Sequence, residues 1–95
     1  MSELDTHVLA PARLKLMITL TAVSEAEFST VRDALEVSDS VLSKHLAALE
    51  TVKYVKRRKG VHRGRRTTWI SVTPTGRKAL QAHVAALQEL IGGMA

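Results

Sequence analysis

The chain has 95 residues, of which 45% are hydrophobic, and its 14 Lys and Arg outnumber nine Asp and Glu. This length suits one domain with a single core, and the lack of cysteine excludes a disulfide framework, a thiolate metal site and a cysteine nucleophile. The longest apolar-rich window, at 14–23, contains Lys15 and is too short to cross a bilayer, and the first residues lack the order of a signal peptide. We therefore expect a soluble cytoplasmic protein with no membrane association.

Apolar residues at helical spacing predict three helices in the first half of the chain. Pro11 suits the first turn of a helix, and Ser38 before Asp39 is a strong N-cap followed by an acidic first turn. Phe28 is expected in a short strand, with Ser29 capping the helix that follows. The predicted helices span about 11–22, 30–36 and 39–52.

After the third helix the pattern changes from helix to strand. Strands at about 54–59 and 67–73, joined by the glycine-containing loop GVHRG at 60–64, predict a β-hairpin. A last helix then starts at Pro74 and ends at the glycine pair 92–93. One face of that helix carries the apolar residues Leu80, Val84, Leu87 and Ile91. The fold class that follows is mainly α with a small β-hairpin.

The charges are strongly divided along the chain. Residues 1–50 hold eight acidic and four basic residues, whereas residues 51–88 hold ten basic residues and no acidic one. Seven of these ten lie within positions 56–66. Like charges at this density repel one another, so a folded chain that keeps them is expected to meet a polyanion. A solvated basic loop without a partner is the alternative.

Three segments together resemble the small winged-helix transcriptional regulators of the MarR and ArsR type. They are VSDSVLSKHLAALETVKYV at 37–55, the basic hairpin with GRRTTW at 64–69, and SVTPTGRKAL at 71–80. The resemblance covers about residues 4–91 and implies a winged helix-turn-helix with a three-helix core, a two-stranded wing and a C-terminal helix. It divides the single domain 1–95 into a first helix with its N-terminal segment (about 4–22), a helix-turn-helix (28–53), a wing (54–73) and a dimerisation helix (74–91).

In that family the helix after the turn enters the major groove of duplex DNA, and the wing touches the minor groove or its flanking phosphates. For this chain the resemblance implies a reading helix at 39–52 and a wing at 60–66. These roles agree with the residue types. The planar guanidinium group of arginine fits phosphates, and short polar residues near the start of a helix allow close approach to base edges. The implied DNA-binding residues are Ser38, Asp39, Ser40, Ser43, Lys44, His45, Lys56, Arg57, Arg58, His62, Arg63, Arg65 and Arg66.

Some of these residues have a structural alternative. A capping role alone explains Ser38 and Asp39 equally well. His45 could be partly buried or could donate to a phosphate. Two other residues depart from the family pattern, because Glu36 and Lys53 stand where the family usually has glycine. A lysine in a left-handed conformation is strained by about 1 kcal/mol relative to glycine, so these departures bear on the pose of the reading helix rather than on the fold.

The terminal segments are candidates for self-association, since the family forms dimers through its terminal helices. The implied homodimer residues are Val8, Leu9, Leu80, Val84, Leu87 and Ile91, and packing of the last helix on its own core is the alternative. We expect no metal or cofactor, because His7, His45, His62 and His83 are scattered. A site formed by His7 and His83 across the dimer, or a small effector between the terminal helices, stays open.

The function expected is a non-enzymatic, sequence-specific regulator of transcription that binds double-stranded DNA as a homodimer and acts as a repressor. No phosphate-binding glycine loop and no nucleophile beside a base is present in the sequence. Two other functions remain. One is an architectural or RNA-binding winged helix with little sequence preference, and the other is a protein-interaction module in which the basic hairpin is incidental.

Overall fold

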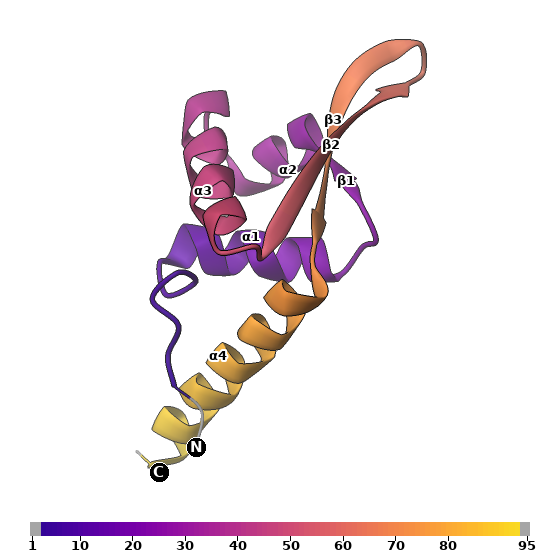
Figure 1. The fold of residues 1–95 in the computed structure, drawn as a ribbon. Helices are drawn as coiled ribbons and strands as arrows, with labels where there is room; N and C mark the ends of the chain where they lie inside the picture. The colour runs from indigo at the N-terminus through magenta and orange to yellow at the C-terminus, as the bar shows by residue number, and fades with distance from the viewer. Residues whose placement is uncertain (1–2, 94–95) are drawn as a thin grey trace.

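The computed structural model describes residues 3–93, and Figure 1 shows their arrangement. In chain order the elements are α1 (Pro11–Thr21), β1 (Ala26–Glu27), α2 (Phe28–Leu35), α3 (Asp39–Thr51), β2 (Val55–His62), β3 (Arg65–Val72) and α4 (Pro74–Gly93). The predicted helical fold with a hairpin is confirmed, and β1 extends the hairpin into a sheet of order β1-β3-β2. In Figure 1, α3 and the tip of the hairpin rise on one side of the molecule, while α4 runs to the opposite side.

Helices α1, α2 and α3 pack around an aliphatic core that also takes in the base of the sheet. The stripe predicted for α3 is confirmed, because Leu42, Leu46 and Leu49 are all fully buried. Side chains of this size contribute roughly 1.5–3 kcal/mol each when they are withdrawn from water. The core residues are Val8, Leu16, Met17, Leu20, Val31, Leu42, Leu46, Leu49, Val55, Ile70, Val72 and Leu80.

The start of α2 differs from the prediction. Phe28, expected in a strand, is the first residue of α2, and Ser29, expected as its N-cap, lies inside the first turn. The N-cap is Glu27, whose side chain makes no capping hydrogen bond. Glu27 has an extended backbone because it pairs with Trp69 in the sheet. Pairing between strands, rather than a capping side chain, therefore sets where α2 begins.

The two positions that depart from the family's glycine pattern both have a left-handed backbone. The φ angle is 56° at Glu36, after α2, and 63° at Lys53, after α3. At the end of α3, the N–H of Tyr54 donates to the carbonyl of Leu49 and the N–H of Lys53 to that of Glu50, each at 2.9 Å. These two bonds define a Schellman C-cap, and the same pair of bonds closes α2. Both helices thus end with the geometry that glycine favours.

The β2–β3 hairpin is longer than the sequence predicted. Its strands stay paired up to His62 and Arg65, which leaves Arg63 and Gly64 as a two-residue turn. The φ angles of these two residues are 53° and 77°, as a type I′ turn requires. A turn of this type matches the right-handed twist of the strands, so the basic tip is held on a regular hairpin.

The prediction of a loop at 60–64 was wrong because it took Gly60 as the first loop residue. This residue lies within β2 and pairs with Thr67. A Cβ atom at position 60 would lie 3.0 Å from the indole ring of Trp69 and 2.7 Å from the guanidinium of Arg58. The glycine therefore marks a close approach of these two side chains to the backbone and not the start of a turn.

Helix α4 is anchored at the base of the sheet. The hydroxyl of Thr73 donates to the carbonyl of Lys53 at 2.6 Å and accepts from the N–H of Gly76 at 3.0 Å, so it caps the helix. Gly76 is buried, and a Cβ there would collide with the backbone carbonyl of Tyr54. None of the helices within residues 3–93 is long and apolar enough to cross a membrane.

The N-terminal segment is fixed by Asp5. Its backbone N–H donates to Nδ1 of His83 on α4 at 2.8 Å, and its carboxylate accepts from the hydroxyl of Tyr54 at 2.5 Å and from the N–H of His7 at 2.8 Å. The hydrogen bond to the carboxylate raises the pKa of Tyr54 to about 12. These contacts hold Val8 in the core, where it is fully buried.

Candidate nucleic-acid interface

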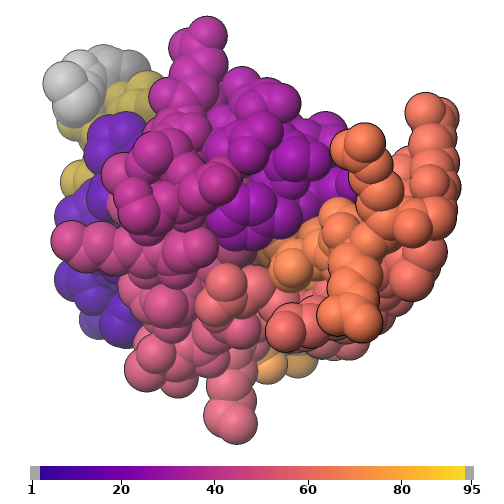
Figure 2. Space-filling model, turned by 90° about the horizontal axis from the view of Figure 1, so that it is seen from above, coloured from indigo at the N-terminus to yellow at the C-terminus, as the bar shows by residue number. Residues whose placement is uncertain are grey.

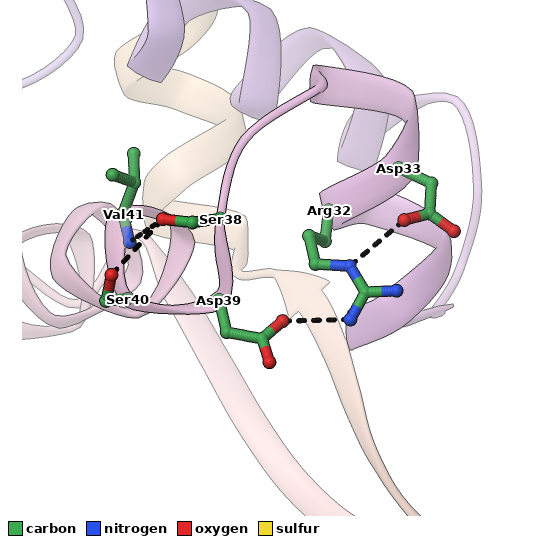
Figure 3. A network of polar contacts seen from close by, with 6 residues as sticks. All are labelled: Arg32, Asp33, Ser38, Asp39, Ser40 and Val41. Carbon is green, nitrogen blue, oxygen red and sulfur yellow. Dashed lines mark hydrogen bonds and ion pairs between the residues drawn. The ribbon is translucent and has the colours of Figure 1, made fainter.

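Ser38 caps α3, as predicted. Its Oγ accepts from the N–H of Val41 at 3.2 Å and lies 3.2 Å from the Oγ of Ser40 (Figure 3). The backbone amides of a first helical turn form the positive end of the helix dipole. The predicted reading helix therefore begins with a fixed first turn that favours negative charge nearby.

Asp39 is engaged by an arginine of the preceding helix. Nη1 of Arg32 donates to Oδ1 of Asp39 at 2.9 Å, while Nε of Arg32 donates to Asp33 at 3.0 Å (Figure 3). Arg32 thereby links α2 to the first turn of α3. This ion pair supports a positioning role for Asp39 and adds Arg32, which was not predicted, to the residues that orient α3.

Helix α3 presents an exposed stripe opposite its buried leucines. Successive residues rotate by about 100°, which places Ser40, Lys44, Ala47 and Thr51 on the outer face, and all four are exposed. Ser43 is half-buried beside them. None of the ion pairs found within residues 3–93 involves Lys44. Helical spacing alone could have added Ala47 and Thr51 to the predicted contacts.

His45 joins α3 to α1. Its half-buried ring accepts, through Nδ1, a hydrogen bond from Nε of Arg13 at 3.2 Å. Burial lowers the pKa of His45, and the positive charges of Arg13 and Lys44 lower it further. The ring is therefore neutral near pH 7, and its Nε2 carries the remaining proton.

The tip of the hairpin carries exposed basic side chains. Arg63, Arg65 and Arg66 are exposed, and so is Lys59 on β2. Across the described part of the chain, no ion pair reaches any of these four side chains. Viewed from above in Figure 2, the hairpin stands beside α2 and α3, so the tip and the exposed start of α3 share one side of the molecule.

The base of the hairpin is different, because its arginines are neutralised. Arg57 lies 2.5 Å from the carboxylate of Glu50 at the end of α3. Arg58 donates two hydrogen bonds of 2.7 Å to Glu25 and lies over the ring of Trp69, 5.6 Å from its centroid. Of the lysines and arginines predicted to bind DNA, these two are the ones in ion pairs within residues 3–93. The acidic partners are distant in sequence, and no local pattern pairs them.

An open cleft with a volume of about 900 Å³ lies between the hairpin and the start of α2. Within it Nε2 of His62 lies 3.3 Å from the carboxylate of Glu27, which also accepts from the hydroxyl of Thr67 at 3.2 Å. These contacts tie the outer part of the hairpin to β1. The residues lining the cleft are Glu27, Phe28, Ser29, Lys59, Gly60, Val61, His62, Arg63, Arg65, Arg66, Thr67 and Thr68.

A family model described as a winged helix DNA-binding domain matches residues 12–91. The chain belongs to this winged-helix family. A curated relative, an uncharacterised protein of Methanocaldococcus jannaschii, is 31% identical over 78 residues, which are 82% of this chain and 85% of the relative. In winged-helix terms α2 and α3 form the helix-turn-helix, and the β2–β3 hairpin is the wing.

Two solved structures illustrate the likeness. A transcriptional regulator homologue from Pyrococcus horikoshii OT3 is 28% identical, with a TM-score of 0.86 over 93% of this chain and 87% of the other. The MepR protein of S. aureus, solved as a complex with DNA, is 21% identical, with a TM-score of 0.74 over 88% of this chain and 68% of the other. The second likeness is one of fold. The resemblance to small winged-helix transcriptional regulators is thereby confirmed.

The residues predicted to form a dimer divide into three groups by their exposure. Val8 and Leu80 are only 0% and 7% exposed and belong to the core of a single winged-helix chain, so they offer no surface to a second copy. Val84 and Leu87 are half-buried. Leu9 and Ile91 are exposed, as is the unpredicted Leu90. The buried stripe of α4 includes His83 and Ala86, which apolar spacing alone did not indicate.

The two histidines considered for a site between two copies, His7 and His83, each have contacts within a single chain. His83 is fully buried and bonded through Nδ1 to the backbone of Asp5, and its Nε2 has no hydrogen-bond partner within the described chain. The ring of His7 is exposed and meets the ring of Tyr54 edge-on, with 6.1 Å between their centroids. Residues 3–93 contain no group of three or more His, Cys, Asp or Glu placed to hold a metal ion.

Proposed function

We propose that this protein is a sequence-specific regulator of transcription that binds double-stranded DNA as a homodimer and represses the genes it controls. The observation that carries the proposal is that the exposed stripe of α3 and the arginines of the wing tip lie on one side of the molecule (Figures 1 and 2). No ion pair within residues 3–93 engages these arginines. A regulator of this kind acts in the compartment that holds the chromosome, and the location we propose is the cytoplasm.

Helix α3 is the part that reads sequence in the major groove. Ser40 and Ser43 are short enough to let the helix approach base edges, and Lys44 is long enough to reach a guanine or a phosphate. The neutral ring of His45 keeps an N–H donor at Nε2, which suits a phosphate oxygen. Ser38 fixes the first turn of α3 by capping it.

The wing supplies phosphate contacts and reaches the minor groove. Arg63 and Arg65 lie at and beside the turn, and their planar guanidinium groups fit phosphates or a narrow, electronegative minor groove. Arg57 and Arg58 contribute less to binding in this proposal, because Glu50 and Glu25 already neutralise them. Each phosphate that the tip neutralises releases counterions, so the affinity falls steeply with salt.

Dimerisation would place two copies of α3 on one face of the duplex. The exposed apolar side chains near the two termini, Leu9, Leu90 and Ile91, are the surface that a second copy would cover. A dimer of two-fold symmetry binds a pseudo-palindrome whose half-sites are about one helical turn apart. The neighbour MepR, which was solved as a complex with DNA, supports the binding of DNA by this fold.

Methylation interference tests this mode of binding. Dimethyl sulfate modifies guanine N7 in the major groove and adenine N3 in the minor groove, and bound and free duplexes are then separated and cleaved. The proposal expects two clusters of blocking guanines about one turn apart, each flanked by blocking adenines. Interference scattered evenly along the duplex would favour an architectural protein, and preference for RNA over duplex DNA would also contradict the proposal.

A further inference from the structure

The exposed surface of α3 includes a large apolar side chain, that of Val41. Val41 lies in the first turn and is 40% exposed, although the leucine that follows it is fully buried. In Figure 3 its side chain points away from Arg32 and Asp39, which places it on the flank of α3 that faces away from α2. Lys44 follows at i+3 and is therefore its neighbour on the helix surface.

We propose that Val41 contacts the C5-methyl group of a thymine and makes the protein select thymine at one position in each half-site. The inference rests on the proposed function, because it requires α3 to lie in the major groove. The thymine methyl is the apolar group on that edge of the base pairs. A cytosine at the same position has only a hydrogen at C5, so the apolar side chain would lose this contact.

The local structure presents this side chain in a fixed place. The backbone N–H of Val41 donates to Oγ of Ser38 at 3.2 Å, so the cap that starts α3 also holds the residue. A valine in a helix is largely confined to one side-chain rotamer, so little conformational freedom is lost on contact. Lys44 stands beside it and is engaged in no ion pair within residues 3–93. The thymine contact is therefore expected next to a position where lysine meets a guanine or a phosphate.

Deoxyuridine provides the test, because it lacks only the methyl group of thymine. A duplex is first obtained by selection from a random library with the 95-residue chain. Each thymine of that duplex is then replaced by deoxyuridine in turn, and binding is titrated with wild type, Val41→Ala and Val23→Ala. Val23 is the matched control, since it is 43% exposed and lies in the turn between α1 and β1. Thermal unfolding of each variant checks that the fold is intact.

With wild type and with Val23→Ala, one thymine in each half-site is expected to lose about fourfold in affinity on replacement, the value of one buried methyl group. Val41→Ala is expected to bind the unmodified duplex more weakly and to lose its sensitivity at those positions alone. If Val41→Ala responds to every replacement as wild type does, Val41 is not the thymine contact while the proposed function stands. If selection enriches no duplex, the proposed function fails and this inference fails with it.

Discussion

The guanidinium of Arg57 lies 2.5 Å from the carboxylate of Glu50, which joins the first strand of the wing to the last turn of α3. Both side chains are about one-third exposed, at 32% each. The pair fixes the wing relative to α3, and it engages one arginine that could otherwise contact a polyanion. Within residues 3–93 the wing thus contains arginines that are held in ion pairs and others that no ion pair engages.

This division predicts different effects of two arginine substitutions on DNA binding. Arg65→Ala should weaken binding about threefold to tenfold and reduce the slope of log affinity against log salt by about 1 for each wing in the complex. Arg57→Ala removes an arginine that is already paired, so it should leave that slope nearly unchanged. Titrations of each variant at several salt concentrations provide the measurement. Equal changes in slope for the two variants would contradict the division.

The left-handed backbone at Glu36 and Lys53 predicts that glycine at either position would stabilise the folded chain. Lys53→Gly and Glu36→Gly should each raise the free energy of unfolding by about 0.5–1 kcal/mol, because the strain of a side chain at positive φ is relieved. Ala47→Gly, at an exposed position inside α3, is the control and should lower it by about 1 kcal/mol. Urea unfolding measures all three. A loss of stability in Lys53→Gly would show that its side chain has contacts worth more than the strain.

The contact of Gly76 with the backbone of Tyr54 predicts a strong difference between two glycines of α4. Gly76→Ala should lower the free energy of unfolding by about 2 kcal/mol or more, because the added methyl group meets a rigid carbonyl. Gly92 has open space around its Cβ position, so Gly92→Ala should be neutral or slightly stabilising. Thermal or urea unfolding of both variants tests this, and a harmless Gly76→Ala would mean that α4 does not approach the sheet so closely.

Lowered basicity of His45 predicts a loss of stability in acid. Because burial and nearby cations hold its pKa in the folded chain below the usual value of 6.5, the unfolded chain binds the proton more readily. The contribution of His45 is therefore fully present above about pH 6.5 and is lost as the pH falls below that value. Urea unfolding at pH 7.5 and pH 5 should show a smaller loss in His45→Gln than in wild type. An equal loss in both would exclude His45 as a source of the acid sensitivity.

Several features of the fold follow directly from the sequence. The leucines of α3 recur at helical spacing, and Ser38 is both a good cap in sequence and the cap in the structure. Pro11 and Pro74 begin α1 and α4, as residues without an N–H donor often do. These elements could be predicted because the information lies within one or two helical turns of the chain.

The rest depends on contacts between residues far apart in sequence. Glycine is typical of loops, but Gly60 lies within β2, where the ring of Trp69 on β3 approaches its backbone closely. Arg58 meets Glu25 across 33 positions, which no local pattern reveals. The sequence predicted the apolar face of α4. Which part of that face is buried depends on packing between distant segments, since Leu80 and Val8 belong to the same core. The basic stretch indicates where an interface is expected, and ion pairs between distant residues decide which of its arginines the protein itself holds.

A binding titration with the DNA upstream of the gene and with a shuffled duplex of the same composition tests the central claim most directly. It is repeated from roughly 50 to 300 mM salt, a range in which phosphate-dominated binding weakens by orders of magnitude. We predict a preference of about 10³ or more for the native DNA together with a steep salt dependence. Equal affinity for both duplexes would contradict sequence-specific regulation, and binding to neither would mean that the wing is not a DNA-binding element.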